Sequence, residues 1–360
     1  MNKRRLVLWL GLLISLLACN LGAAPPTQPV DLLATLSAST PVGGNTANPY
    51  FPATATSAFF LPTPAVTLSV VTATSISAPS SSLTNPPVGH IVYTCQVYKA
   101  QGTDQICIMN ADGTGFRRLT AEDDSEHYYP SLSPDGNSVL YSAFRSENIY
   151  EIFEMNLNSG EVKQLTNKIG VANAPEVSPD GKSIVFTRWT AASNKYTIML
   201  MDRNGQNVNN IPGAFGWDPT WSPDGKYVLF ASDMNGSVQL YAIRTTGKEL
   251  HQVSNLPAMR GRSDWSADGR YIVTYSGEPW KREVYIMGAD GSSAHVLSPT
   301  GGNSQGPSIS PNGQWVAFTA YFDHPNEDNG CEIYIMRIDG TDLRRLTNND
   351  YCDYQPRWGP

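Results

Sequence analysis

The side chains that most often carry out catalysis are sparse in this chain, and they do not gather in the sequence. Five histidines are scattered over 360 residues, whereas a metal-dependent sugar lyase would need several of them together. The acidic residues within 122–124 and 323–328 lack the regular spacing of calcium ligands, so we interpret them as solvated loop charge, with calcium binding as the alternative. We therefore expect no catalytic residue, no metal and no cofactor.

One carboxylate does recur at a constant interval. The tetrapeptide Ser-Pro-Asp-Gly begins at residues 133, 178 and 222, and variants with Ala267 for Pro and Asn312 for Asp begin at 266 and 310. The interval is therefore 44 or 45 residues. Proline presets φ for a type I turn, Asp fits the next position, and Gly supplies the left-handed residue that closes a hairpin. We assign these aspartates to turns and not to catalysis.

The segments around each turn alternate apolar and polar residues, as strands do. After the turn at 222, Val228 and Phe230 fit a second strand, Leu240 a third, and Val253 a short fourth. Four strands repeated at this interval are typical of propeller blades. The segment before the first motif supplies only three strands, and residues 354–360 match a first strand with nothing after it. We therefore predict an all-β ring of six four-stranded antiparallel blades, closed by pairing of the C-terminal strand with the N-terminal blade.

The repeat also resembles a known family. A unit that reads Pro-x-Trp-Ser-Pro-Asp-Gly, then a strand, then Ile-Tyr-x-Met-x-x-Asp-Gly and finally Arg-x-Leu-Thr is similar to the TolB-type, WD-like propeller repeat. The resemblance covers residues 88–360 and implies the same six-bladed fold. It says little about activity, because propellers are scaffolds that serve many functions.

The first 87 residues have a different composition. Lys3-Arg4-Arg5 followed by a short apolar run predicts a secretory signal peptide over residues 1–18. The ending Leu16-Leu17-Ala18-Cys19 resembles the bacterial lipobox, which implies lipidation of Cys19; an ordinary signal peptide with an incidental cysteine is the alternative. Residues 19–87 are rich in Thr, Ser and Pro, so we predict a disordered tether. Together these features predict an exported lipoprotein, anchored on the extracytoplasmic side of a bacterial membrane.

Charge and cysteine content narrow the partners. The net charge is −7, and no basic stripe occurs, so we exclude nucleic acid. No polybasic patch occurs either, so we expect the lipid to make the only membrane contact, and we expect a monomer. Four cysteines besides Cys19 suggest two disulfides in an exported domain. Placement on the predicted strands favours the pairs Cys95–Cys107 and Cys331–Cys352.

One face of the predicted ring concentrates aromatic and charged side chains. The loop after the second strand of a blade and the loop between blades open on the same side. We assign the following candidate binding residues to these loops: Tyr128, Tyr129, Arg188, Trp189, Trp217, Asp218, Arg260, Arg262, Trp280 and Tyr354. Tyr, Trp and Arg dominate the hot spots of protein interfaces, although packing between blades would also use them.

Three functions remain open from the sequence. The first is a non-catalytic recognition module that binds an envelope protein or peptide through the aromatic face. The second is carbohydrate binding by the same face, since exposed Trp and Tyr suit sugar rings. The third is a lyase or glycosidase, which would require a carboxylate pair or a metal cluster at the mouth of the central channel.

Overall fold

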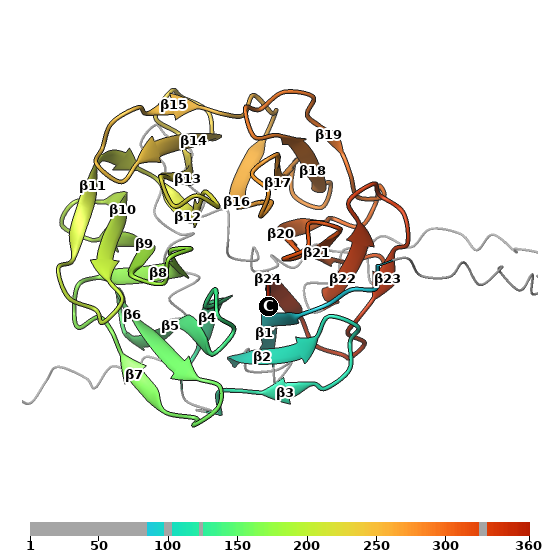
Figure 1. Ribbon diagram of the computed structural model, residues 1–360, viewed down its shortest axis with the longest axis horizontal. Coiled ribbons are helices and arrows are strands. Elements are labelled where there is room, and N and C mark those ends of the chain that lie inside the picture. The colour runs from blue at the N-terminus through green and yellow to red at the C-terminus, as the bar shows by residue number, and fades with distance from the viewer. Residues whose placement is uncertain (1–84, 97–102, 122–124, 324–329) are drawn as a thin grey trace, which may run out of the picture. The chain divides into compact units, whose positions relative to one another are not determined.

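The computed structural model describes residues 85–96, 103–121, 125–323 and 330–360. All of them belong to one compact unit, Ser57–Pro360. They form 24 strands that are arranged in a ring, with each group of four running outward from the axis (Figure 1). The predicted signal peptide, Cys19 and the tether up to residue 84 lie outside the described residues. Within the described part of the chain, no helix has the length and hydropathy of a membrane span.

Most strands form four-stranded antiparallel sheets. From the inner to the outer strand, these are β24-β1-β2-β3 (Asp353–Gly359, His90–Gln96, Asp104–Asn110, Arg117–Arg118), β12 to β15 (Trp217–Trp221, Tyr227–Ser232, Gln239–Arg244, His251–Gln252), β16 to β19 (Met259–Trp265, Tyr271–Ser276, Glu283–Gly288, His295–Val296) and β20 to β23 (Gln305–Ile309, Trp315–Ala320, Glu332–Arg337, Arg344–Arg345). This is the propeller architecture with the predicted blades.

The remaining eight strands form one sheet made of two such groups. They are β4 to β7 (His127–Leu132, Ser138–Ser146, Ile149–Asn156, Val162–Gln164) and β8 to β11 (Val171–Val177, Ser183–Thr190, Lys195–Asp202, Asn209–Phe215). A single parallel bridge between Tyr150 and Val171 joins the two groups. Within each group the pairing is antiparallel, as in the four-stranded sheets.

The repeated tetrapeptide forms the turn between the first and second strand of a blade, as predicted. The Ser178 hydroxyl donates to Asp180 Oδ1 at 2.6 Å, and the backbone N of Ser183 donates back to Ser178 Oγ at 3.0 Å. Gly181 closes the turn with φ of +74°. The same serine contact occurs with Asn312 in place of Asp, at 2.8 Å, because the turn needs only an acceptor oxygen there.

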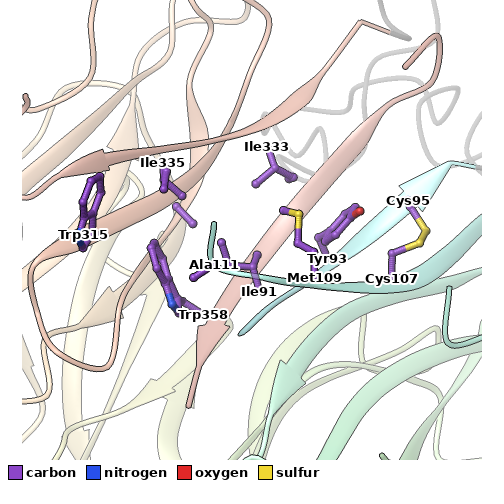
Figure 2. Close-up of a cluster of buried hydrophobic side chains, with 11 residues drawn as sticks. Ile91, Tyr93, Cys95, Cys107, Met109, Ala111, Trp315, Ile333, Ile335 and Trp358 are labelled. Carbon is purple, nitrogen blue, oxygen red and sulfur yellow. A yellow bond between two sulfur atoms is a disulfide. The ribbon is translucent and has the colours of Figure 1, made fainter. Parts of the chain in front are cut away.

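The C-terminal strand closes the ring. β24 pairs with β1 from His90 opposite Gly359 to Cys95 opposite Asp353. Figure 2 shows the core behind this pairing, in which Trp358 lies near Ile91 and packs in one cluster with Trp315. The indole N–H of Trp358 also donates to the Val88 carbonyl at 2.8 Å. Closure therefore buries a large aromatic side chain and satisfies the edge of β1.

Both predicted disulfides are present. Cys95–Cys107 joins β1 to β2, and Cys331–Cys352 joins the start of β22 to the segment before β24. The second bond lies beside the closing strand, where the ring would otherwise open. The backbone N of Asp353 donates to the Cys331 carbonyl at 2.8 Å, which holds the same two segments together.

We expect the Cys331→Ser, Cys352→Ser double variant to lose about 2–4 kcal/mol of unfolding free energy, because the unfolded chain gains freedom when the bond is absent. Chemical denaturation of the two proteins measures the difference. Peptide mapping without reduction should link residues 95 with 107 and 331 with 352. Free thiols in exported protein, or a link between Cys107 and Cys331, would overturn the assignment.

Candidate functional site

The innermost strands of the blades share a backbone irregularity at one set of equivalent positions, which we call the column. In the blades that carry a turn motif, the column lies four residues before the first residue of that motif. Five residues in this column have φ between +51° and +60°: Tyr129, Ala174, Asp218, Gly306 and Gln355. The strand register shifts at the same place in every blade. Proline follows each of the five residues. These are β-bulges, which redirect side chains out of the pleat, and four of them carry the cost of a left-handed residue other than glycine.

Hydrogen bonds between inner strands run all the way round the axis. The column residues make two of the contacts: Arg262 N donates to Asp218 Oδ2 at 3.2 Å, and Tyr129 N donates to Gln355 Oε1 at 2.9 Å. The other contacts use side chains two residues further along: Ser131 to the Pro175 carbonyl, Thr220 to Glu176, Ser308 to Asp264, and Trp358 N to Ser308. Each inner strand is thereby tied to the next.

Arg357 of the closing strand reaches two other blades at this inner wall. Its Nη2 lies 2.5 Å from Glu176 Oε2 on β8, and its Nη1 lies 3.2 Å from Asp264 Oδ1 on β16. Nη1 also donates to the Ser263 carbonyl at 3.2 Å. Burial raises the pKa of Glu176, and the charge of Arg357 opposes that shift. The two carboxylates and Arg357 form a half-buried ionic triad that links three blades.

A hollow lies between the inner strands. It is narrow, because most of the roughly 250 Å³ of space there is open solvent, and it is lined by Tyr129, Pro130, Ser131, Ala174, Pro175, Asp218, Pro219, Arg262 and Arg357. Asp218 and Arg262 each expose only 6% of their surface. Burial lowers the pKa of the Arg262 guanidinium, the nearby charge of Arg357 lowers it further, and Asp218 raises it. The hollow thus places an oppositely charged pair among apolar proline rings.

Three of the predicted binding residues, Tyr129, Asp218 and Arg262, line this hollow. Of the ten, only Trp280 lies in a loop, because the bulged inner strands and the second strands extend further toward the face than the sequence suggested. Trp217 and Trp280 are half-buried against neighbouring rings, Tyr196 at 6.0 Å and Tyr321 at 5.2 Å. Arg188 and Arg260 are half-buried as well, and each donates Nε to a backbone carbonyl.

Of the three remaining predicted residues, Trp189 is half-buried on β9, and Tyr128 and Tyr354 lie beside two acids, the buried Asp104 and the half-buried Glu126. Tyr128 and Tyr354 both hydrogen-bond the carboxyl of Asp104, and the Tyr128 hydroxyl donates to Glu126 Oε2 at 2.8 Å. Burial raises the pKa of Asp104 to about 7, and the charge of Glu126 adds to the shift. These contacts connect β2, β4 and β24 at the face where the inner strands begin.

Stability should therefore fall as the pH rises from about 4 to 7. In this window the folded state keeps a proton on Asp104 that the unfolded state, with its pKa of 3.8, has lost. Asp104→Asn should flatten the dependence of the unfolding free energy on pH, by up to about 4 kcal/mol across the window. Urea unfolding at a series of pH values measures it. Asp135→Asn is the matched control: hydrogen bonds from Ser133 lower the pKa of Asp135 to about 2, so this change should cost a constant amount of stability between pH 4 and 7 and alter the pH dependence only below about pH 4. An unchanged slope in Asp104→Asn would contradict the assignment.

Glu176, Asp264, Arg357 and Gln355 were not among the predicted residues. Glu176 and Asp264 stand two residues before a turn motif, where other blades carry Ser131, Thr220 and Ser308. In the last strand, Arg357 occupies the equivalent position and Gln355 lies two residues before it. Among the described residues, no group of three or more His, Cys, Asp or Glu is arranged to hold a metal ion.

A ring of four-stranded antiparallel blades, tied together around its axis, defines this chain as a β-propeller protein. Residues 87–327 match PD40, the TolB β-propeller domain, and the chain belongs to that family. It is similar to the crystal structure of TolB from Acinetobacter baumannii, with a TM-score of 0.66 and 27% identity, over 76% of this chain and 67% of that chain. A putative TolB from Agrobacterium tumefaciens shares the fold, with a TM-score of 0.56 and 19% identity, over 76% of this chain and 99% of that one.

Curated relatives match over shorter stretches. The Tol-Pal system protein TolB of Francisella tularensis is 23% identical over 145 residues, which are 40% of this chain and 33% of that protein. An uncharacterised protein of Agrobacterium fabrum is 34% identical over 107 residues, 29% of this chain and 36% of that one. The chain therefore spans about a third of the length of the curated relatives it matches.

Proposed function

We propose that this chain is a non-catalytic recognition module of the bacterial envelope that binds a protein or peptide at the mouth of its central hollow. The observation that carries the proposal is the bulged column. Four left-handed residues other than glycine at equivalent places are costly, and such strain concentrates at binding and active sites. The bulges turn Tyr129 and Asp218 toward the hollow, where Arg262 joins them.

The family membership supports a partner in the envelope. The name of the Francisella relative places that protein in a Tol-Pal system, and we extend that setting to this chain. We infer six blades, counting β4–β7 and β8–β11 separately. We further propose a signal peptide at 1–18, a lipid on Cys19, a tether to residue 87 and a monomeric propeller from residue 88. The lipid would make the only membrane contact.

The inner wall gives no support to a hydrolase or lyase. Glu176 and Asp264 converge there on Arg357, which lies between them. Their other oxygens accept from neighbouring blades: Glu176 Oε1 from Trp221 N at 3.0 Å, and Asp264 Oδ2 from Ile309 N at 2.9 Å. A general acid or base must exchange protons with a substrate, whereas these carboxylates are held in place as structural acceptors.

The half-buried tryptophans of the same face test the proposal. We expect Trp189→Ala to weaken binding of the envelope partner by about 1–3 kcal/mol while the melting temperature barely moves. Trp221→Ala is the matched control: this side chain exposes only 6% of its surface, so its loss should cost about 3–5 kcal/mol of stability. The partner is first captured from envelope extract with the wild-type chain, and its affinity for each variant is then measured. Trp217→Ala and Trp280→Ala complete the series.

An unchanged affinity in Trp189→Ala, Trp217→Ala and Trp280→Ala would contradict binding at this face. If a glycan array gives specific binding and the envelope extract gives no protein partner, carbohydrate recognition replaces the proposal.

A further inference from the structure

The polar groups of the central hollow are unevenly distributed. Pro130, Pro175 and Pro219 line it, and a proline ring presents no N–H donor. The Ser131 hydroxyl is already bonded to the Pro175 carbonyl at 2.6 Å. Besides Arg357, the charged side chains that line the hollow are Asp218 and Arg262, from the neighbouring strands β12 and β16.

These two side chains have opposite charge and are fixed side by side. Asp218 Oδ2 accepts from Arg262 N at 3.2 Å, and the Asp218 backbone N donates to Thr187 Oγ1 at 3.0 Å. Arg262 Nη2 lies 3.4 Å from the Gln355 carbonyl, and its guanidinium lies 5.9 Å from the centre of the Tyr129 ring. Both side chains are buried, so charges in the hollow are only weakly screened.

The hollow is closed below by Arg357. This residue lies two positions further along its strand than the bulged column, and it is held by Glu176 and Asp264. A ligand group must therefore enter from the face where the inner strands begin. The narrow space limits the entering group to the tip of one side chain or a single peptide group.

The geometry points to an amide as the group that this hollow receives: the side chain of Asn or Gln, or a backbone peptide group, from an extended segment of the partner. An amide offers a carbonyl acceptor to the Arg262 guanidinium and N–H donors to the Asp218 carboxylate. A carboxylate would face Asp218, and an ammonium group would face Arg262. This inference rests on the proposed function, because it names the chemistry that the partner presents.

The test uses three size-matched probes on the full-length chain: propionamide, propionate and propylammonium. Each is titrated into ¹⁵N-arginine-labelled protein while the Nε–Hε signal of Arg262 is followed by NMR. Absence of the signal in Arg262→Lys identifies it. Propionamide should bind at least about tenfold more tightly than either ion. Propionate meets the like charge of Asp218 and propylammonium meets that of Arg262, and in a poorly screened site such repulsion exceeds the free energy that a tenfold difference in affinity represents.

Charge-switch variants sharpen the test. Asp218→Asn leaves a net cation and should shift the preference to propionate, whereas Arg262→Gln should shift it to propylammonium. Circular dichroism shows whether each variant folds. If a variant does not fold, the order of the three probe affinities on the wild-type chain still tests the proposal. Tighter binding of either ion to the wild type, or no shift of the Arg262 signal with propionamide, would overturn the amide site.

The two proposals fail separately. If an envelope protein binds at this face but propionamide leaves Arg262 unchanged, the amide site is wrong and the recognition module stands. If propionamide binds and no envelope protein does, the recognition module is wrong and the amide site stands.

Discussion

Deletion of residues 353–360 should give insoluble protein, or protein whose cooperative unfolding transition is lost. The deletion removes β24, so β1 loses its inner partner along the register from His90 to Cys95. It also removes the buried Trp358, and it removes Arg357 together with its ion pair to Glu176 at the inner wall. Truncating one buried Trp alone costs about 3–5 kcal/mol, and a whole domain has only about 5–15 kcal/mol of stability.

Thermal unfolding and the soluble yield after export measure this effect. Deletion of Pro360 alone is the control, because Pro360 is exposed and its carbonyl accepts one hydrogen bond, from the His90 ring Nδ1 at 2.9 Å. That control should stay folded. A chain lacking residues 353–360 that melts like the full-length protein would disprove closure by β24.

Arg357→Ala should lower the free energy of unfolding by up to about 3 kcal/mol, because it leaves the half-buried carboxylates of Glu176 and Asp264 without their cation. Arg118→Ala, an exposed position on β3, should change stability little and controls for the loss of a charge. Urea denaturation of both variants beside the wild type gives the two differences.

The Arg357→Ala deficit should shrink as the pH falls from 7 toward 5. Arg357 is the group that holds the pKa of Glu176 down against burial, so its removal raises that pKa further. The folded variant then binds a proton that the unfolded chain, with a pKa near 4.5, has lost, and acidification favours the folded state. A deficit that stays constant over this pH range would show that lost packing, and not an uncompensated charge, causes the instability.

The repeat made the fold predictable, because each copy carries its own turn chemistry and strand pattern. Ser178 to Gly181 specify a hairpin through contacts within a few residues, and the five copies fix the interval. The disulfide pairs and the closing role of the C-terminal strand were predictable because the positions of the repeat copies assign each cysteine and the last residues to particular strands and loops.

The inner wall was not predictable in the same way. Arg357 meets Glu176 across 181 positions of sequence, and the two residues come together only when the ring has closed. Their column carries a different side chain type in most blades, so no motif marks it. The binding residues were assigned to loops because the turn residues gave no indication of the bulges, which lengthen the inner strands toward the face.

The most direct test of recognition at this face is site-specific photo-crosslinking in cells. A crosslinking amino acid replaces Ala192 or Glu278, which are exposed beyond the ends of β9 and β17 on the face where the inner strands begin. In matched strains it replaces Lys182 or Lys226, which are exposed at the turn motifs on the opposite face. Binding at the mouth of the hollow predicts that positions 192 and 278 crosslink to an envelope protein and that 182 and 226 do not. Crosslinks from 182 and 226, with none from 192 and 278, would contradict it.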